Sequence, residues 1–228
     1  MRVAVLFSGG KDSVFTMHRC MKQGMKVACL ITMHSANKAS YMFHTAAIKM
    51  TKLQAKAIGI PLLTFKTKGE KEKELADLEG AIMSANEKYG LDGAAAGALA
   101  SAYQKERVEK ICADLGLKCI APLWLTDQEK YLYEILSKGF EVIFTGIAAQ
   151  GLNEKWLGRK LDEKAISELV ALHRRYGSHI GGEGGEYETL VIDGPIFKKR
   201  IELIETYKAM ENECTGKLEI LNAKLAPK

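Results

Sequence analysis

The chain has 228 residues, of which 47% are hydrophobic and 27% are charged, and its formal net charge is +5. This composition is typical of a folded chain with one domain and a small addition, and it excludes disordered or low-complexity classes. The five cysteines form an odd set with no C-x-x-C pair, which argues against a disulfide framework and against a zinc ribbon. No credible signal peptide or membrane span is visible, so we expect a cytoplasmic protein with no membrane partner.

The first predicted element is an apolar strand over residues 3–7, which runs directly into a glycine-rich turn, residues 8–13. After Ser13, apolar residues recur at helical spacing, and Gly24 stands where a glycine would end that helix. Adjacent glycines let backbone N–H groups point inward, and the helix start adds the positive end of its dipole. The turn is therefore predicted to bind the phosphates of ATP. The alternative is an ordinary glycine turn with an incidental lysine.

Short apolar strands and amphipathic helices alternate through the next part of the chain. We expect strands over residues 27–32, 61–65, 93–96, 118–120 and 140–145, and helices over residues 45–58, 75–89, 104–115 and 128–137. This alternation predicts an α/β fold, in which a doubly wound, mostly parallel, Rossmann-like sheet has helices on both faces.

Ligands bind such sheets at the carboxyl ends of the strands, where the winding direction reverses. Two further loops are predicted at that edge. One follows the second strand and contains His34, Tyr41 and His44, and the other begins at Gly97. We expect His44 and Gly97 to help bind the nucleotide. A surface or packing role for the histidines, and a simple turn at Gly97, are the alternatives.

The pattern changes near Gly146, and we expect two domains, residues 1–146 and 147–228. The second should be a smaller α+β lobe with a helix around residues 166–173 and strands near 190–192, 201–207 and 217–223.

Residues 181–189 contain four glycines and three glutamates, a composition that disfavours both a helix and a strand. A metal, ammonium or a cationic substrate group would offset the negative charges, and an exposed acidic loop is the alternative.

The turn after the first strand does not fit the Walker A pattern, because Asp12 separates Lys11 from Ser13. Its sequence, S-G-G-K-D-S, instead resembles the PP-loop of the ATP pyrophosphatases, which cleave ATP between the α and β phosphates. The segments 103–108 and 122–124 and the sequence E-G-G-E-Y-E-T at residues 183–189 complete the pattern. With them, the whole chain resembles the diphthine-ammonia ligase family in its short, archaeal-like form.

This resemblance implies an N-terminal ATP pyrophosphatase domain of the adenine nucleotide α-hydrolase type and a C-terminal lobe for the substrate. The family uses ATP and ammonium to amidate diphthine, a modified histidine of translation elongation factor 2. Because a carboxylate lacks a good leaving group, amidation would pass through an acyl-adenylate and release AMP and pyrophosphate.

The resemblance also suggests roles for the residues of both glycine-rich segments. The departing pyrophosphate would be held by Ser8, Gly9, Gly10, Lys11 and Ser13. Asp12 would be the partner of Mg²⁺, or else only an acid favoured by the helix dipole.

The acidic segment would serve the other substrates. Glu183, Glu186 and Glu188 would hold ammonium, deprotonate it, or orient the trimethylated substrate. Tyr187 would either face that cation or anchor the lobe.

Three other functions are compatible with a PP-loop. A tRNA-modifying PP-loop enzyme should show a stronger basic footprint and, for thiolation, paired cysteines, so a nucleic-acid partner is not expected. A glutamine-dependent amidotransferase would need a glutaminase domain, for which the chain has no room. A nucleotide-binding sensor that never turns ATP over is the non-catalytic alternative.

Overall fold

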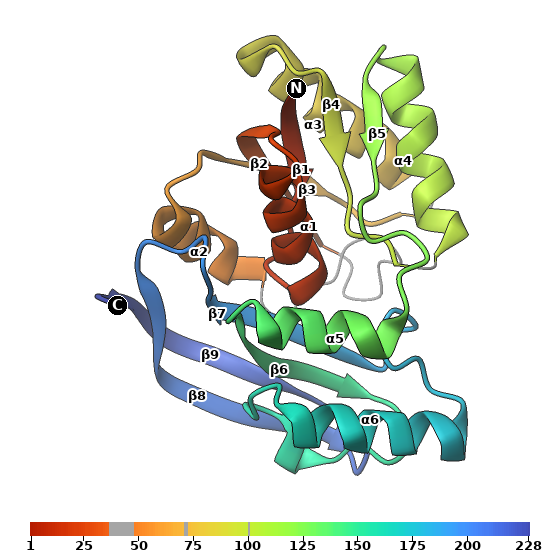
Figure 1. Cartoon of the computed structure of the whole chain (residues 1–228), viewed down its shortest axis with the longest axis vertical. Helices are drawn as coiled ribbons and strands as arrows, with labels where there is room; N and C mark the ends of the chain where they lie inside the picture. Colours follow the sequence, from red (N-terminus) through yellow and green to blue (C-terminus); the bar gives the residue numbers. More distant parts are fainter. Residues whose placement is uncertain (37–47, 71–72, 100) are drawn as a thin grey trace.

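The computed structural model describes residues 1–36, 48–70, 73–99 and 101–228, and it shows two lobes stacked along the longest axis (Figure 1). The first lobe contains β1 (Arg2–Leu6), α1 (Lys11–Lys22), β2 (Lys26–Ser35), η1 (Ile48–Met50), α2 (Thr51–Ile58), β3 (Leu62–Thr67), α3 (Lys73–Tyr89), β4 (Gly93–Ala95), α4 (Ala102–Asp114) and β5 (Lys118–Ile120). The rest of the chain contains α5 (Gln128–Ser137), β6 (Glu141–Ala148), η2 (Glu154–Trp156), α6 (Glu163–Tyr176), β7 (Tyr187–Asp193), β8 (Arg200–Asn212) and β9 (Thr215–Ala226).

The first lobe is built on a parallel sheet with the strand order β3-β2-β1-β4-β5. The order runs outward from β1 in both directions, so the winding reverses between β1 and β4. The α/β, doubly wound class predicted from the alternation of strands and helices is therefore confirmed. The loops that follow β1 and β4 lie next to each other at the carboxyl edge of this sheet.

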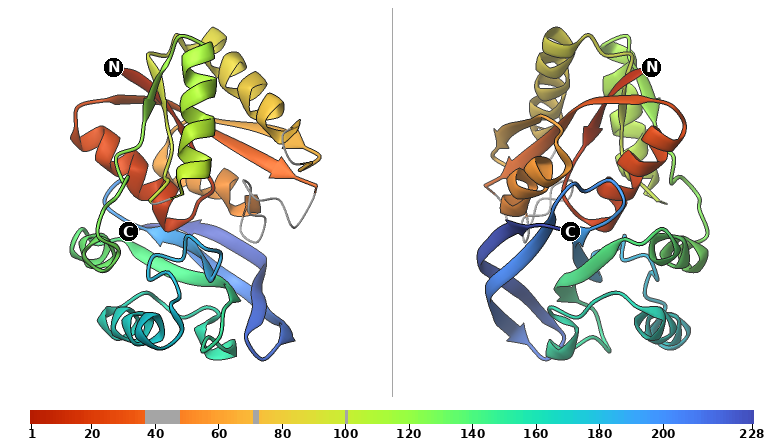
Figure 2. Two further views of the ribbon diagram at one scale, coloured as in Figure 1. Left: turned by 90° about the vertical axis from the view of Figure 1, so that its right-hand side faces the viewer. Right: turned by 60° about the vertical axis from the view of Figure 1, so that its left-hand side comes forward.

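The central strand β1 is buried on both faces, as its uninterrupted apolar sequence predicts. Val3 and Val5 face the core shared with α1 and α2, whereas Ala4 faces a second core beneath α3 and α4. Figure 2 shows the same arrangement, with α3 and α4 on the side of the sheet opposite to α1. Helices cover both faces, which leaves the carboxyl edge as the place for a ligand.

The second lobe is an antiparallel sheet with the order β7-β6-β9-β8, and α5 and α6 lie on one of its faces (Figures 1 and 2). We expected the strand near residues 140–145 to complete the parallel sheet, and that expectation was wrong. This strand is β6, and it pairs with β7 and β9. The residues around it read equally well as either kind of buried strand, and only its distant partners decide the sheet. The domain boundary expected at Gly146 falls inside β6.

A single apolar core passes from the first lobe into the second. Phe15 of α1 packs edge-to-face on Tyr131 of α5 and on Phe140, with ring centroids 5.6 and 5.5 Å apart. The same cluster continues into the second sheet through Phe144 and Leu190. The carboxyl edge of the parallel sheet is therefore held in a fixed position against β7.

The second glycine-rich segment also differs from its prediction. Only its first part is irregular, because β7 begins at Tyr187 and includes Glu188 and Thr189. Pairing with β6 supplies the backbone hydrogen bonds that the local composition does not favour. In the described part of the chain, no helix has the length and apolarity that a membrane crossing requires.

Candidate functional site

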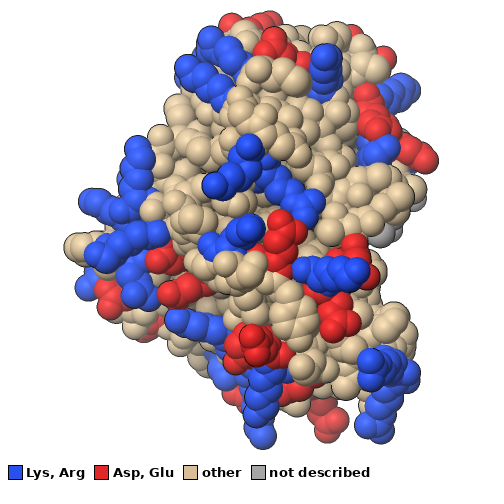
Figure 3. Space-filling view, in the orientation of Figure 1, with Lys and Arg blue, Asp and Glu red and all other residues tan. Residues whose placement is uncertain are grey.

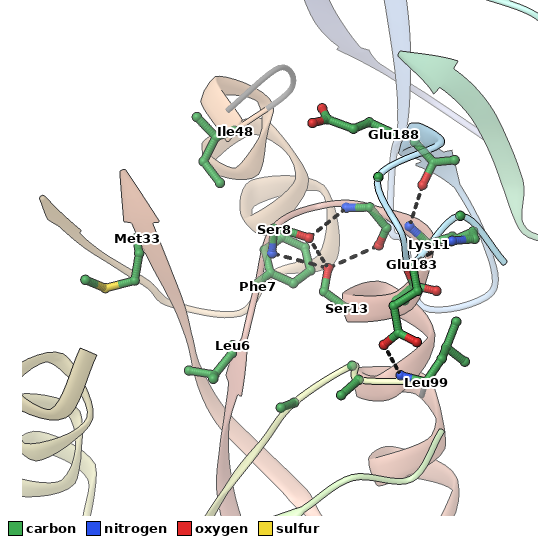
Figure 4. Close-up of a pocket in the computed structure, with 18 of the residues that line it drawn as sticks. Leu6, Phe7, Ser8, Lys11, Ser13, Met33, Ile48, Leu99, Glu183 and Glu188 are labelled. Carbon is green, nitrogen blue, oxygen red and sulfur yellow. Dashed lines mark hydrogen bonds and ion pairs between the residues drawn. The ribbon is translucent and has the colours of Figure 1, made fainter. Parts of the chain in front are cut away.

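A cavity of about 230 Å³ lies at the carboxyl edge of the parallel sheet, where the second lobe closes over it (Figure 4). Three segments supply its polar wall: the turn after β1, the loop after β4 and the segment before and within β7. Its apolar wall comes from β1, β2 and the helices beside them, and includes Leu6, Ile31, Met33, Ile48 and Leu78. One side of the cavity therefore suits a flat apolar group and the other suits charged groups.

The turn after β1 is closed by one hydroxyl. Ser13 Oγ accepts the backbone N–H groups of Ser8 at 3.3 Å and Gly9 at 3.1 Å, and it donates to the carbonyl of Gly10 at 3.1 Å. Gly9 has φ +81°, a left-handed conformation that favours glycine, and a Cβ there would clash with Gln54 Oε1. The N–H groups of Ser8 and Gly9 therefore converge on the Ser13 hydroxyl.

The second lobe holds this turn from outside. The carbonyl of Gly9 accepts the N–H of Val191 in β7 at 3.1 Å and Gln54 Nε2 at 2.8 Å. The N–H of Lys11 donates to Thr189 Oγ1 at 3.1 Å. Thr189 is the last residue of the acidic motif, so the two glycine-rich segments are in direct contact.

Lys11 is almost fully buried, with 3% of its side chain exposed. Its Nζ donates to the carbonyl of Gly181 at 2.6 Å and to Asp12 Oδ2 at 3.0 Å, and it lies 5.2 Å from the centroid of the Tyr187 ring. These contacts offset the desolvation of the ammonium group. Among the described residues they take two of its three donors.

Asp12 borders the cavity with 34% of its side chain exposed. Its Oδ1 accepts the hydroxyl of Tyr131 at 2.8 Å, so both of its oxygens are hydrogen-bonded. Gly97 packs against the backbone of Asp12, because a Cβ at Gly97 would lie 2.9 Å from the Asp12 carbonyl carbon. Gly97, which we expected to help bind the nucleotide, thus borders the cavity and packs directly against the phosphate loop.

The three glutamates of the acidic motif point in different directions. Glu183 borders the cavity with 13% of its side chain exposed, and its Oε1 accepts the N–H of Leu99 at 2.7 Å. Glu188 also borders the cavity, and its carboxylate extends toward the side where Ile48 lies (Figure 4). Glu186 is not among the described residues that border the cavity, and its Oε1 accepts the N–H of His179 at 2.7 Å.

His179 lies between two of these glutamates. Its Nδ1 accepts the N–H of Glu183 at 3.3 Å, and its Nε2 lies 3.9 Å from Glu183 Oε2. Burial lowers the pKa of His179 below its ordinary value, and the carboxylates of Glu183 and Glu186 oppose that shift. His179 therefore braces the acidic segment as a neutral ring at neutral pH.

Tyr187 is buried and fills the space beside Gly182. Its hydroxyl donates to the carbonyl of Ile180 at 2.6 Å, and Lys11 lies over its ring. Of the two roles considered for Tyr187, these contacts favour the anchor.

Some expected residues are not at the cavity or cannot be placed. His34 lies in β2, and it is not among the described residues that border the cavity. Tyr41 and His44 lie outside the described residues. Among the residues that are described, no group of three or more His, Cys, Asp or Glu side chains could hold a metal ion. A cation at this site would therefore need ligands from a bound substrate in addition to Asp12.

Three residues of the site were missed by the sequence reasoning. Thr189 had a signal, since it ends the acidic motif, but the contact with Lys11 joins residues 178 positions apart. Tyr131 reads as one apolar position on an amphipathic helix. Gln54 gives no signal, because a fully buried glutamine on α2 looks like any polar helix residue.

Two family models match the chain: the diphthamide synthase N-terminal domain over residues 1–119 and the diphthamide synthase C-terminal domain over residues 127–225. The chain is 37% identical over 231 residues to the diphthine–ammonia ligase of Danio rerio, with 93% of this chain and 90% of that protein covered. It is 35% identical to the diphthine–ammonia ligase of Schizosaccharomyces pombe, and there the match covers all of this chain and 40% of the longer yeast protein.

Among solved structures, a predicted subunit of tRNA methyltransferase from Methanocaldococcus jannaschii covers 86% of this chain and 98% of its own. With a TM-score of 0.43 and 17% identity, that likeness is too weak to inform the function. The two family models and the curated relatives agree with the two sequence motifs, and they establish that the chain belongs to the diphthamide synthase family.

Proposed function

We propose that this chain is an AMP-forming ligase that uses ATP and ammonium to amidate diphthine on translation elongation factor 2. The observation that carries the proposal is one cavity bordered both by the phosphate loop and by the acidic motif. A ligase of this kind must bring a polyphosphate and a cationic, carboxylate-bearing substrate within bonding distance. The names of the relatives at 35–37% identity support the same reaction.

The phosphate loop fits the ATP end of this reaction. We assign Ser8, Gly9, Gly10 and Ser13 to the pyrophosphate, together with the third donor of Lys11. Negative charge builds up on the pyrophosphate as the α phosphorus is attacked, and donors held in place before the reaction stabilise that charge. Gly97 keeps the neighbouring loop close, and we assign His44, which lies outside the described residues, to the nucleotide as well.

Mg²⁺ is expected to accompany ATP, and Asp12 is the residue we assign to it. The fit rests on the two hydrogen bonds from Lys11 and Tyr131, which hold the Asp12 carboxylate in one orientation at the edge of the cavity. Mg²⁺ in proteins often takes only one or two carboxylates and completes its shell with phosphate oxygens and water. When bound, the ion would neutralise part of the phosphate charge.

The acidic motif fits the amine and the protein substrate. We assign Glu183 and Glu188, which border the cavity, to ammonium or to the trimethylammonium group of diphthine. The carboxylate of diphthine would attack the α phosphorus and displace pyrophosphate, which forms the acyl-adenylate. A carboxylate of the motif would take one proton from ammonium, the resulting ammonia would attack the acyl carbon, and AMP would leave as the nitrogen loses a second proton to give the amide. We assign Glu186 to shaping the loop that carries the other two glutamates.

The proposed function also bears on the location of the protein in the cell and on whether it binds nucleic acid. An enzyme that modifies a translation factor belongs in the cytoplasm. On the face seen in Figure 3, lysine and arginine side chains over the second lobe are interspersed with aspartate and glutamate. This face shows no continuous basic stripe of the kind that tRNA binding favours.

One assay separates the candidates. The purified chain is incubated with Mg²⁺, ATP, ammonium and diphthine-bearing elongation factor 2, and AMP, pyrophosphate and the mass of the factor are measured. We expect stoichiometric AMP formation and a mass change that matches the replacement of a carboxyl by an amide. Stimulation by tRNA instead of the factor would favour a tRNA-modifying enzyme, and binding of ATP without AMP release would favour a sensor.

A further inference from the structure

Tyr131 is a buried polar residue that reaches the phosphate loop from the second lobe. It lies on α5, a helix of the second lobe, and its side chain is fully buried. Its hydroxyl donates to Asp12 Oδ1 at 2.8 Å, across 119 positions of the sequence. Tyr131 is not among the described residues that border the cavity, whereas Asp12 is. Any effect of Tyr131 on a bound substrate must therefore pass through Asp12.

The ring of Tyr131 has little freedom to move. It packs edge-to-face on Phe15, with the two ring planes at 68°. Phe15 lies on α1 only three positions after Asp12, so the same helix carries the carboxylate and the surface on which the tyrosine rests. A hydroxyl fixed in this way can select one rotamer of Asp12, which otherwise has 34% of its side chain exposed at a cavity.

The other carboxylate oxygen is fixed as well. Asp12 Oδ2 accepts Lys11 Nζ at 3.0 Å, so one donor reaches the carboxylate from each side. An ionised carboxylate has about four acceptor positions, and this clamp uses two of them. The remaining lone pairs keep a defined direction, which an ion with near-octahedral geometry demands of its ligands.

The Tyr131 hydroxyl is the donor in this hydrogen bond, and the Asp12 carboxylate oxygen is the acceptor.

We propose that Tyr131 is a positioning residue that orients the Asp12 carboxylate toward the Mg²⁺ of the Mg·ATP complex. The inference rests on the proposed function, in which Asp12 is the partner of that ion. It makes the second lobe part of the nucleotide site, since the residue that orients Asp12 is supplied by α5.

The test compares Tyr131→Phe with Tyr133→Phe. The first variant removes one oxygen and keeps the packed ring. The second is a matched control, because Tyr133 lies on the same helix with 38% of its surface exposed. Binding of ATP is measured calorimetrically with Mg²⁺ and with EDTA, and AMP formation is measured over a range of Mg²⁺ concentrations.

For Tyr131→Phe we expect about a tenfold rise in the Mg²⁺ concentration for half-maximal AMP formation, the size of effect typical for loss of a hydrogen bond to a charged group. Affinity for ATP should fall in Mg²⁺ and stay unchanged in EDTA. Tyr133→Phe should match the parent chain in every measurement. If Tyr131→Phe lowers the melting temperature and weakens ATP binding equally with and without Mg²⁺, the tyrosine is merely structural and the inference is wrong.

A double variant separates this inference from the proposed function. Once Asp12→Asn has removed the carboxylate, adding Tyr131→Phe should change the affinity for Mg·ATP no further. Additive losses would overturn the positioning role. If the parent chain itself forms no AMP, the ligase proposal fails, and the calorimetric comparison still decides whether Tyr131 acts on the metal complex.

Discussion

The two glycine-rich segments that meet at the cavity are built in opposite ways. The turn at residues 8–13 is closed from within, since Ser13 Oγ gathers the N–H groups of Ser8 and Gly9. The segment at residues 181–189 is held by its surroundings, since Glu183 is bound by Leu99 and Glu186 by His179. A phosphate loop is a backbone structure and can be recognised locally. Glutamates of the same type take their roles from neighbours that only the fold supplies.

Lys11 belongs to the first segment and donates to Gly181 of the second. Its replacement should have the largest effect on AMP formation. Lys11→Met removes the cation of the phosphate loop and its bond to Gly181. We expect AMP formation to fall by about a thousandfold, since removal of one preorganised donor costs on the order of a hundred- to a thousandfold in rate. The measurement is single-turnover AMP release with elongation factor 2 present.

Lys22→Met is the matched control, because Lys22 is exposed in the last turn of the same helix. It should leave the rate within about twofold of the parent, as surface substitutions away from a site usually do. If Lys11→Met kept the parental rate while remaining folded, the phosphate loop would not be the site of the reaction.

The second prediction asks whether the glutamates differ as their contacts indicate. Glu183→Gln keeps an oxygen for the N–H of Leu99 but removes a charge at the cavity. We expect diphthine amidation to fall about a hundredfold, with ATP affinity unchanged, because loss of a positioned acid–base group costs about that much.

Glu186→Gln is the comparison within the same motif. Its amide oxygen can still accept the N–H of His179, so we expect a loss of about tenfold or less, the cost of a weakened charge-assisted bond. Equal losses in the two variants would contradict the division of roles inside the segment.

The third prediction concerns the loop after β4, which packs against the phosphate loop. Gly97→Ala would place a Cβ 2.9 Å from the carbonyl carbon of Asp12, and neither backbone can yield easily. We expect a loss of about 1–3 kcal/mol in the free energy of unfolding, as for other overpacked sites, together with weaker ATP binding. Gly80→Ala in α3 is the control, since nothing lies within 4 Å of its new Cβ. That substitution should stabilise the chain by about 0.5–1 kcal/mol in urea unfolding.

The smallest effect should come from His179, whose ring contacts the acidic segment, and it should appear in the pH dependence of stability. The pKa of His179 is lowered in the folded chain, so the unfolded chain takes up the proton first as pH falls. The stability due to neutral His179 is complete above its ordinary pKa of 6.5 and is lost as pH falls below that value.

The melting temperature of His179→Asn should therefore fall less than that of the parent between about pH 7.5 and 5.5. His173→Asn, on the exposed side of α6, should follow the parent curve. If the melting temperature of His179→Asn fell with pH as steeply as that of the parent, protonation of His179 would not be what destabilises the folded chain. His18 and His34 shift in the same direction, so part of the slope should persist in every variant.

The sequence predicted the parallel sheet and the phosphate loop because both leave local signals. The strands are continuous apolar runs, and Gly9 marks a left-handed turn in any context. The sequence did not predict the sheet to which β6 belongs, because the choice between a parallel and an antiparallel partner depends on strands that come later in the chain. It could not show the bond from Tyr131 to Asp12, since an aromatic residue on an apolar helix face reads as packing.

One apolar core continues from α1 through α5 into the second sheet. In the described part of the chain, the two lobes therefore share a core and could not separate without breaking it. Separating the lobes would expose a large area of aliphatic and aromatic surface to water, and the free-energy cost would be far above that of moving a loop. Substrates and products would therefore enter and leave the cavity while the two lobes stay together. Turnover would then be governed by local rearrangements beside the cavity rather than by motion of whole lobes.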